Sequence, residues 1–494
     1  MRAHRLERSI RRSNRRRGAA PLATLALLLL AGCGDEPSTA VDAGAPDSGT
    51  PDAGSQSVDA GTDGGPPACA ELFDLEPPGT TPSSAWADVA SLDAVFTFDV
   101  AAQRTTADVT WTIRTGPSAD PIVFDLLQQP AELEVDGATI AGDAIGTATL
   151  PGSTPSTIRL LPVSPCSTHV VTARYELAPT PAGATDAPRR VPRFDAEADT
   201  VIWAPRMSDQ RPGMYLESWL PASLVHDAFE STIRFVVVGG APHRLFANGE
   251  IETSAENDWT VRYPATFRSS SHFWYLAPSE GMRVVERSVG DVAITVVAMP
   301  DHTEAIEPLA DEVVASIPDF ERFLGPYPHP AFLAVITPES YGMEHAGATL
   351  TVPRLLRHEL MHSWIGRGAY PRRARHNWID EALVTYYENY VEPRPLGDRP
   401  PTRLEGTGWV RGWADDDHYF LGADLFRAWA NELGAAPLHQ LLREFFVARH
   451  GRDYTTEELR TALYCASRST EILRTFDRHV FGLESPGPAP DCEP

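Results

Sequence analysis

The sequence predicts an α+β protein with two folded regions: an antiparallel β saddle or sandwich over residues 69–285, then a mixed α/β and finally helical region over residues 286–494. Three observations predict this class. Short segments of alternating polarity fill the first region, two continuous apolar runs open the second, and apolar residues at helical spacing follow to its end. Of the 494 residues, 42 % are hydrophobic and 22 % are charged, so each region has enough apolar material for a core.

The first region reads as a set of short strands. Residues 95–100 and 109–113 alternate apolar and polar side chains, as strands with one buried face do. Further short apolar runs follow at residues 122–124, 170–171, 233–238 and 273–276. Proline, glycine, asparagine and aspartate separate these runs at intervals typical of antiparallel strands. Titratable residues there do not gather at metal-ligand or triad spacing, so we expect this region to act as a scaffold or to shape a binding surface.

The second region has a different hydrophobic pattern. Residues 292–297 and 332–336 are continuous apolar runs, as in strands buried on both faces. Residues 304–323, between them, have helical periodicity. After residue 353 this periodicity dominates, for example in the apolar positions of residues 438–446. The order predicts a mixed sheet followed by helices.

The amino terminus has the pattern of an export signal. Residues 2–17 are rich in arginine, and residues 19–30 form a short apolar run, which is typical of a secretory signal and too short to span a bilayer. The next residues complete Leu-Ala-Gly-Cys33, which resembles a bacterial lipobox. This resemblance implies that residues 1–33 are a lipoprotein signal, that Cys33 is lipidated, and that the protein is anchored in the cell envelope. Gly34 stands where an aspartate retains lipoproteins in the inner membrane of some bacteria, so the outer membrane is favoured. An ordinary signal with an incidental cysteine is the alternative.

Residues 34–68 have the composition of a disordered tether. They repeat Asp-x-Gly at irregular spacing among alanine, serine, threonine and proline, without the apolar residues needed for a core. The whole chain has a formal net charge of −25, with 67 acidic and 42 basic residues. Because nucleic-acid binding needs a basic face, this charge argues against nucleic acid as a partner.

Four cysteines follow the tether: Cys69, Cys166, Cys465 and Cys492. An even number in an exported protein indicates two disulfides. Pairing neighbours along the chain joins Cys69 to Cys166 and Cys465 to Cys492, although the sequence leaves other pairings open.

The pentapeptide over residues 358–362 is an H-E-x-x-H motif, and the flanking proline and glycine predict a helix over residues 353–365. Two histidines four residues apart lie on one side of a helix, so His358 and His362 can bind the same metal ion. Glu359 is placed to reach a water molecule near that ion without binding the ion itself. The pattern predicts a zinc site with Glu359 as general base.

A third ligand lies downstream. Glu381 follows His362 after 18 intervening residues, near the start of a second predicted helix. Two histidines, one glutamate and one open position are the composition of a catalytic zinc site rather than of a structural one. A zinc ion in such a site activates water at neutral pH, and Glu359 can accept the proton. The sequence therefore predicts one zinc ion per chain.

The segment Tyr-Gly-Met-Glu-His over residues 341–345 is the point at which the chain resembles the gluzincin aminopeptidases of the membrane alanyl aminopeptidase family. In that family a Gly-x-Met-Glu-Asn element runs beside the substrate, and its glutamate holds the free amine. The resemblance implies these substrate-binding places for Gly342, Met343 and Glu344, and a thermolysin-like fold for residues 286–494. His345 replaces the family's asparagine. The glycyl aminopeptidase gluzincins, with Gly-Leu-Glu-His, are the second resemblance, but they place a longer span before the glutamate ligand.

The resemblance also implies a donor to the oxyanion. The family has a tyrosine in a Tyr-x-Lys-Gly-Ala segment, and Tyr419 opens a matching Tyr-Phe-Leu-Gly-Ala here. A phenol hydroxyl can stabilise the negative charge that develops on the tetrahedral oxygen. Tyr386, Tyr387 and Tyr390 compete for this role. Many family members add a helical domain that covers the active site. We do not expect such a domain after residue 494, and we therefore expect a more open cleft.

Together these features predict a zinc-dependent metallopeptidase, an aminopeptidase acting on the first peptide bond of peptides at the cell envelope. His358, His362 and Glu381 bind zinc, Glu359 and Tyr419 are catalytic, and Glu344 anchors the amine. A zinc endopeptidase of the same fold and a non-catalytic envelope module that binds peptides are the alternatives.

Overall fold

The computed structural model describes residues 80–492, except 127, 149–157, 178–190, 208–215, 223–226, 339–340, 390–391 and 407–415. All described residues belong to one compact unit, Gly65–Pro494. The predicted signal, Cys33, the tether, Cys69 and Tyr390 lie outside the described residues.

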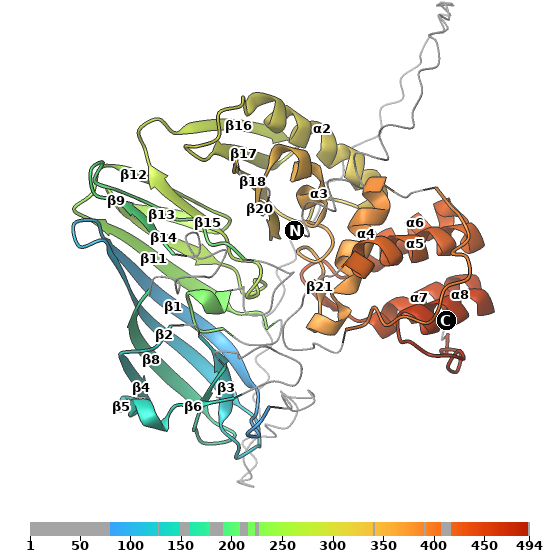
Figure 1. The fold of residues 1–494 in the computed structure, drawn as a ribbon, viewed down its shortest axis with the longest axis horizontal. Helices are drawn as coiled ribbons and strands as arrows, with labels where there is room; N and C mark the ends of the chain where they lie inside the picture. Colours follow the sequence, from blue (N-terminus) through green and yellow to red (C-terminus); the bar gives the residue numbers. More distant parts are fainter. Residues whose placement is uncertain are drawn as a thin grey trace, which may run out of the picture. The chain divides into compact units, whose positions relative to one another are not determined.

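The β region contains a large, mostly antiparallel sheet (Figure 1). Only β1 and β11 among its neighbouring strands run parallel, and the long chain between them makes that direction possible. Alternate residues of β1 are buried, among them Phe96 and Phe98, as the alternating sequence predicts. In spatial order the described strands are β13 (Glu250–Ala255), β14 (Asp258–Tyr263), β11 (Glu230–Val238), β1 (Ala87–Asp99), β2 (Arg104–Thr115), β8 (Thr168–Glu176), β4 (Glu132–Val135) and β5 (Ala138–Thr139).

Smaller sheets enclose an aromatic core against the large one. Trp203 lies at the centre, with ring centroids 5.1 Å from both Phe96 and Trp274. Tyr175 is also buried and donates its hydroxyl proton to the Trp219 carbonyl. The small described sheets are β3–β7–β6 (Ile122–Asp125, Ile158–Leu161, Gly146–Thr147), β10–β9 (Thr200–Ile202, Arg193–Asp195) and β12–β15 (His243–Ala247, Trp274–Pro278), with short 3-10 turns at Gly142–Ala144 and Leu216–Ser218.

A mixed five-stranded sheet opens the second region. Its strands, in spatial order, are β16 (Arg283–Val289), β17 (Val292–Ala298), β18 (Ala331–Ile336), β20 (Ala348–Thr351) and β19 (Gly342–His345). The parallel pairs β17–β18 and β18–β20 form its centre, whereas β19 is an antiparallel edge strand. Helix α2 (Glu307–Leu324) connects β17 to β18, as the periodicity of residues 304–323 predicts.

Both faces of this sheet are covered, which explains why its central strands are continuously apolar. Ile294 and Phe332 face the core shared with helix α2. On the other face, Leu333 and Val335 pack with Phe246 and Tyr275 of the β12–β15 sheet. Burying each large apolar side chain contributes about 1.5–3 kcal/mol. The two regions therefore share a core, and the β region supports the sheet that ends in β19.

Helices follow the sheet and end with the chain. They are α3 (Leu356–Met361), α4 (Trp378–Asn389), α5 (Asp416–Leu433), α6 (Ala435–Val447), α7 (Thr456–Ser467) and α8 (Thr470–His479), with 3-10 turns at Pro353–Leu355 and Ala374–His376 and a short sheet of β21 (Tyr370–Pro371) and β22 (Asp453–Tyr454). The helix expected over residues 353–365 is shorter, because a 3-10 turn precedes it and the chain turns at Gly366, whose φ is +81°. Within the described part of the chain, we find no helix with the length and hydrophobicity needed to cross a membrane.

Asn248 joins the β region to the loop after β19. Its amide Nδ2 donates to the carbonyls of Ser271 and Ala346, each at 2.7 Å, and its Oδ1 accepts from the Phe273 N–H at 2.8 Å. One side chain thus holds two segments of the chain: Ser271 is 23 residues from Asn248, and Ala346 is 98 residues from it. This bracing fixes the end of the strand that carries Glu344.

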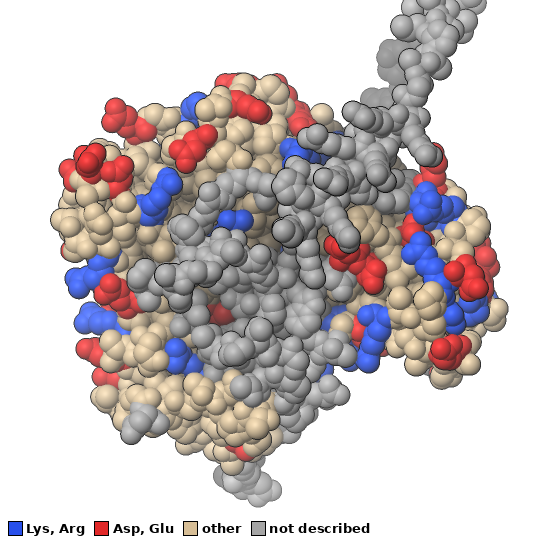
Figure 2. Space-filling model, in the orientation of Figure 1, with Lys and Arg blue, Asp and Glu red and all other residues tan. Residues whose placement is uncertain are grey.

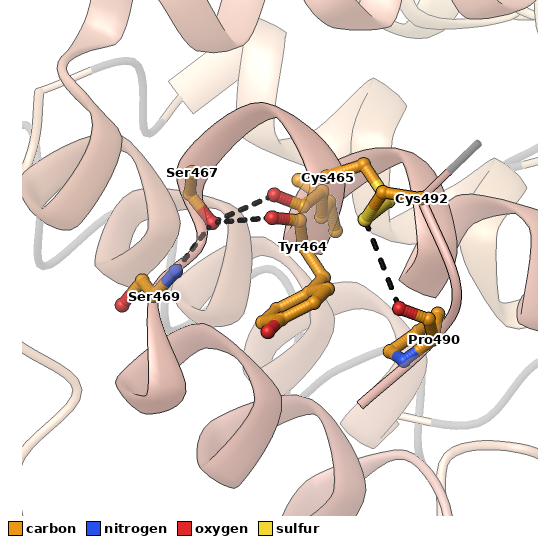
Figure 3. Close-up of a disulfide and its surroundings, with 7 residues drawn as sticks. Tyr464, Cys465, Ser467, Ser469, Pro490 and Cys492 are labelled. Atoms are coloured by element: carbon orange, nitrogen blue, oxygen red, sulfur yellow. Dashed lines mark hydrogen bonds between the residues drawn. A yellow bond between two sulfur atoms is a disulfide. The ribbon is translucent and has the colours of Figure 1, made fainter. Parts of the chain in front are cut away.

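A disulfide joins Cys465 of α7 to Cys492 in the carboxyl-terminal tail (Figure 3). Ser467 caps the end of the same helix by donating to the Leu463 carbonyl. Cys166 is also disulfide-bonded, and Cys69, its expected partner, lies outside the described residues. The Cys465–Cys492 bond fastens the described tail to the helical region.

Acidic and basic side chains are interspersed over the described part of the face shown in Figure 2. Several form exposed ion pairs, such as Arg474 with Glu471 at 2.6 Å and Arg262 with Glu252 at 2.8 Å. Exposed pairs of this kind contribute at most about 1 kcal/mol each. The stability of the fold therefore rests on its shared apolar cores.

Buried His272 makes stability depend on pH. Its Nδ1–H donates to the Arg268 carbonyl and its Nε2 accepts from the Ser231 hydroxyl, each at 2.8 Å, so the neutral ring is satisfied. Burial lowers its pKa from 6.5 to about 4. Below pH 6.5 the unfolded chain binds more protons at this group than the folded chain does, so stability falls as the pH decreases from 6.5 towards 4.

We predict that acidification from pH 8 to pH 5 removes about 2 kcal/mol through His272 alone. The comparison is between urea unfolding of the wild type and of His272→Gln, followed by tryptophan fluorescence at both pH values. The variant starts less stable but loses less on acidification. Equal losses in the two proteins would contradict the prediction.

Candidate metal centre and its surroundings

Three side chains meet where α3 lies against α4. His358 is in α3, His362 is the first residue after α3, and Glu381 is in the first turn of α4. The Nε2 atoms of the two histidines are 3.2 Å apart, and Glu381 Oε2 lies 3.3 Å from that of His358 and 3.5 Å from that of His362. The structure therefore brings together all three residues that the sequence predicts as ligands.

The spacing of these atoms fits a zinc ion. Bonds of 2.0–2.1 Å to zinc in tetrahedral geometry place neighbouring ligand atoms about 3.3 Å apart. Among the described residues, Glu381 Oε2 is buried without a hydrogen-bond partner, although buried carboxylate oxygens are normally satisfied. Two imidazole nitrogens and one carboxylate oxygen are also the donor set that zinc prefers in catalytic sites. The residues present thus fit the expected metal.

Two further carboxylates orient the histidines. Asp380 Oδ1 accepts from His362 Nδ1 at 2.6 Å, and Glu388 Oε2 accepts from His358 Nδ1 at 3.2 Å. Because a carboxylate only accepts, each Nδ1 carries the proton and each Nε2 presents its lone pair to the centre. Neither carboxylate was predicted from the sequence. Glu388 lies seven residues after Glu381, on the same side of α4, and this spacing was the available signal.

Gly366 makes room for Asp380. Its φ of +81° is in the left-handed region, and a Cβ at this position would overlap the Asp380 carboxylate. The Asp380 side chain is completely buried. A glycine here therefore allows the turn after α3 to approach the start of α4 closely enough for Asp380 to reach His362.

Glu359 lies over the edge strand β19. It is 4 % exposed, and a Cβ added to Gly342 would overlap its carboxylate. Burial is the main cause that raises the pKa of Glu359, to about 8. One carboxylate oxygen of Glu359, one of Glu344 and a ring nitrogen of His362 all lie within 4.8 Å of one another. Glu359 is thus next to the centre and separate from its three ligand atoms.

The rest of β19 divides between the site and the core. Glu344 is buried, and its Oε1 accepts from Arg367 at 2.7 Å. Met343 is 2 % exposed and packs in the core of the β region. His345 is completely buried and lies against Phe273, with ring centroids 4.8 Å apart. The strand thus places Glu344 beside Glu359, while Met343 and His345 anchor it.

Tyr419 reaches the centre from α5. Its hydroxyl donates to Glu381 Oε1 at 2.5 Å, and its ring lies nearly parallel to that of His358, with centroids 6.5 Å apart. A Cβ on Gly422, one turn later, would overlap the Cβ of Ala382 in α4. The absence of that atom lets α5 approach α4 and brings Tyr419 to Glu381.

The competing tyrosines are engaged elsewhere. The hydroxyl of Tyr386 lies 2.9 Å from His439 Nε2 of helix α6. The Tyr387 ring packs against the same histidine and against Phe323. Among the described tyrosines of the sequence analysis, Tyr419 is therefore the one whose hydroxyl contacts a predicted ligand.

Another group of titratable residues, His376, Glu405 and Glu457, comes from the turn before α4, the chain between α4 and α5, and the first turn of α7. Arg375 is 3.5 Å from Glu405 and 3.3 Å from Glu457, so this group already holds a positive charge. His376 Nδ1 accepts from the Thr456 N–H at 3.2 Å. We interpret this group as an ion-pair network that connects the turn before α4 and the chain after α4 to the start of α7.

No sequence profile of a known protein family matches the chain. Solved structures do resemble it. A variant of an M1 zinc metallopeptidase from Deinococcus radiodurans, bound to a Tyr-Ser-Ala substrate, aligns at a TM-score of 0.56 and 20 % identity over 79 % of this chain and 93 % of its own. Legionella pneumophila aminopeptidase A in complex with aspartic acid aligns at a TM-score of 0.58 and 14 % identity, over 79 % of this chain and 49 % of its own. Yeast LTA4 hydrolase in complex with Bestatin aligns at a TM-score of 0.57 and 14 % identity, over 82 % of this chain and 69 % of its own.

These likenesses establish the fold. The β region followed by a mixed sheet and helices is the architecture shared with the M1 zinc metallopeptidases, and the predicted α+β class is confirmed.

We predict that Asp380→Asn lowers zinc affinity about 10–100-fold, because an amide cannot hold His362 with its Nδ1 protonated as well as a carboxylate does. Affinity is measured by competition with a chromogenic chelator. Asp477→Asn is the matched control, since Asp477 is equally buried and pairs with Arg460 away from the histidines. Unchanged affinity in Asp380→Asn, or an equal loss in the control, would refute the role of Asp380.

Proposed function

We propose that the protein is a zinc-dependent aminopeptidase that hydrolyses the first peptide bond of peptides. The single observation that carries the proposal is the set of three nearly equal separations, 3.2, 3.3 and 3.5 Å, among the Nε2 atoms of His358 and His362 and Glu381 Oε2. Glu359 and Glu344 lie beside this set. The M1 fold supports the proposal, because the solved structures of that fold include aminopeptidases.

His358, His362 and Glu381 would hold the zinc ion. When bound, zinc acts as a Lewis acid that polarises a peptide carbonyl and makes water acidic enough to attack at neutral pH. Asp380 and Glu388 keep the two imidazoles in the tautomer that binds a metal. These positions are held before any substrate arrives, so catalysis does not need to rearrange them.

Glu359 would act as general base and then as general acid. Its buried carboxylate is close enough to His362 to take a proton from the attacking water and deliver it to the leaving amine. Burial favours the protonated form of a carboxyl group, and a cation among the ligands favours the ionised form. The Glu359 carboxyl can therefore exchange a proton in both directions near neutral pH.

Tyr419 would stabilise the oxygen that becomes negative in the transition state. Its hydroxyl donates to Glu381 Oε1 in this structure. Rotation of the hydroxyl group about its C–O bond redirects the proton without moving the ring. Removing one such donor typically lowers kcat about 100- to 1000-fold. The hydrogen bond to Glu381 keeps the oxygen beside the ligand atoms.

Glu344 would bind the free amino terminus of the substrate. A carboxylate at a fixed distance from the metal ligands selects the first peptide bond, because the ammonium group and the carbonyl to be attacked are separated by one residue. The substrate seen with the D. radiodurans protein, Tyr-Ser-Ala, supports a short peptide as the class of substrate.

The function is tested with one peptide in two forms, with a free and with an N-acetylated amino terminus. We predict that the zinc-loaded protein removes residues stepwise from the free form only, and that Glu359→Gln abolishes cleavage while it keeps the zinc. Products are identified by mass spectrometry.

Each other result selects an alternative. Internal cleavage of both forms would indicate a zinc endopeptidase. Removal of amino-terminal glycine alone would indicate an enzyme similar to the glycyl aminopeptidase gluzincins. Cleavage of neither form beyond the Glu359→Gln background would favour a peptide-binding module of the envelope.

We also propose that the protein acts at the bacterial cell envelope, anchored by lipid at Cys33. The support is the basic, apolar and Leu-Ala-Gly-Cys pattern over residues 1–33. In a bacterial host that processes lipoproteins, we predict that Cys33 is the acylated first residue and that Cys33→Ser yields no acylated form. The amino terminus is examined by mass spectrometry, and an unmodified cysteine within a longer chain would contradict the anchor.

A further inference from the structure

Arg367 is a buried cation that joins two parts of the site. It lies in the turn after His362 and is 1 % exposed. Its NH2 donates to Glu344 Oε1 at 2.7 Å, and its NH1 donates to the Gly366 carbonyl at 3.0 Å. The same NH1 lies 3.7 Å from Asp380 Oδ2. One guanidinium thus stands between the carboxylate of β19 and the carboxylate that orients His362.

This arrangement requires an arginine. Burying a positive charge is costly unless partners surround it, and Arg367 has two buried carboxylates as partners. A guanidinium presents donors on a rigid plane and can face two acids at once, whereas a lysine presents a single point charge. The geometry is therefore specific to an arginine at this position.

The contact restricts Glu344 in particular. A free glutamate side chain has several rotatable bonds, and ordering them costs free energy when a ligand binds. Glu344 also lies within 4.8 Å of the Glu359 carboxyl group, so whenever Glu359 is ionised, repulsion between the two carboxylates favours rotation of Glu344 away from the centre. Arg367 opposes that rotation by holding Oε1, which leaves Glu344 oriented before a substrate arrives.

We propose that Arg367 is a positioning residue that gives the site its specificity for peptides with an unblocked amino terminus. It acts through Glu344: the guanidinium holds one carboxylate oxygen so that the carboxylate is preoriented to bind the substrate ammonium. The inference rests on the proposed aminopeptidase function and adds a determinant of substrate class to it.

The test uses the full zinc-loaded protein, the free and the N-acetylated peptide, and the variants Arg367→Gln and Arg367→Lys. Arg460→Gln is the matched control, because Arg460 also pairs with a buried carboxylate, that of Asp477, in the α7–α8 pair. For each protein, zinc content, kcat and KM are measured. Binding of both peptides is measured by calorimetry in the Glu359→Gln background.

We expect Arg367→Gln to raise KM for the free peptide about tenfold or more, with a much smaller change in kcat, and to weaken calorimetric binding of the free peptide by a similar factor. Binding of the acetylated peptide and the zinc content stay unchanged. Arg367→Lys recovers part of the loss, since it restores charge without the planar fork. Arg460→Gln changes none of these quantities beyond a loss of stability.

Free-peptide KM and affinity in Arg367→Gln equal to the wild type would overturn the inference. If that variant does not fold, Arg367→Lys decides in the same way: an unchanged KM overturns the role, and a raised KM with unaltered acetyl-peptide binding supports it. A wild type that does not distinguish the two peptides overturns the proposed function as well. A wild type that distinguishes them, with variants that do so equally, overturns the role of Arg367 alone.

Discussion

The approach of α4 to α3 places Glu381 Oε2 within 3.5 Å of two imidazole nitrogens in a buried position. Acids and bases so close together are stable inside a protein only where charge is balanced and hydrogen bonds are satisfied. The side chains around the three ligands meet this requirement. Asp380 and Glu388 accept the outer protons of the histidines, and Arg367 supplies positive charge between Asp380 and Glu344. The proposed zinc ion adds the remaining positive charge at the centre of the three ligands.

Three glycines make this density of groups possible. Gly342 leaves room for Glu359, Gly366 for Asp380, and Gly422 for the contact of α5 with Ala382. In each case a single Cβ would displace a functional side chain or the helix that carries one. The β region contributes from the opposite side, because Asn248 holds the loop after β19 and the Leu333 face of the mixed sheet rests on the β12–β15 sheet. The site therefore depends on backbone approach as much as on its acids and histidines.

Much of the fold was predictable because local patterns carry it. Alternating residues predicted β1 and β2, and continuous apolar runs predicted β17 and β18, because strands buried on one or on two faces differ in that way. The parallel pairing of β1 with β11 was not predictable, since it joins segments far apart in the chain. The length of α3 was overestimated, because its end is determined by the turn at Gly366 and by the contact of that turn with Asp380 rather than by local propensity.

The sequence by itself determined the type of chemistry: the spacing of His358 and His362 puts both on one side of a helix, and Glu359 follows from the same motif. Only the tertiary structure decided which distant groups complete the site. Tyr419 rather than Tyr386 meets Glu381, Glu388 reaches His358, and Arg367 reaches Glu344. The physical reason is range. Helical spacing fixes neighbours within two turns, whereas contacts between elements depend on how closely their backbones pack, and that is decided by the whole core.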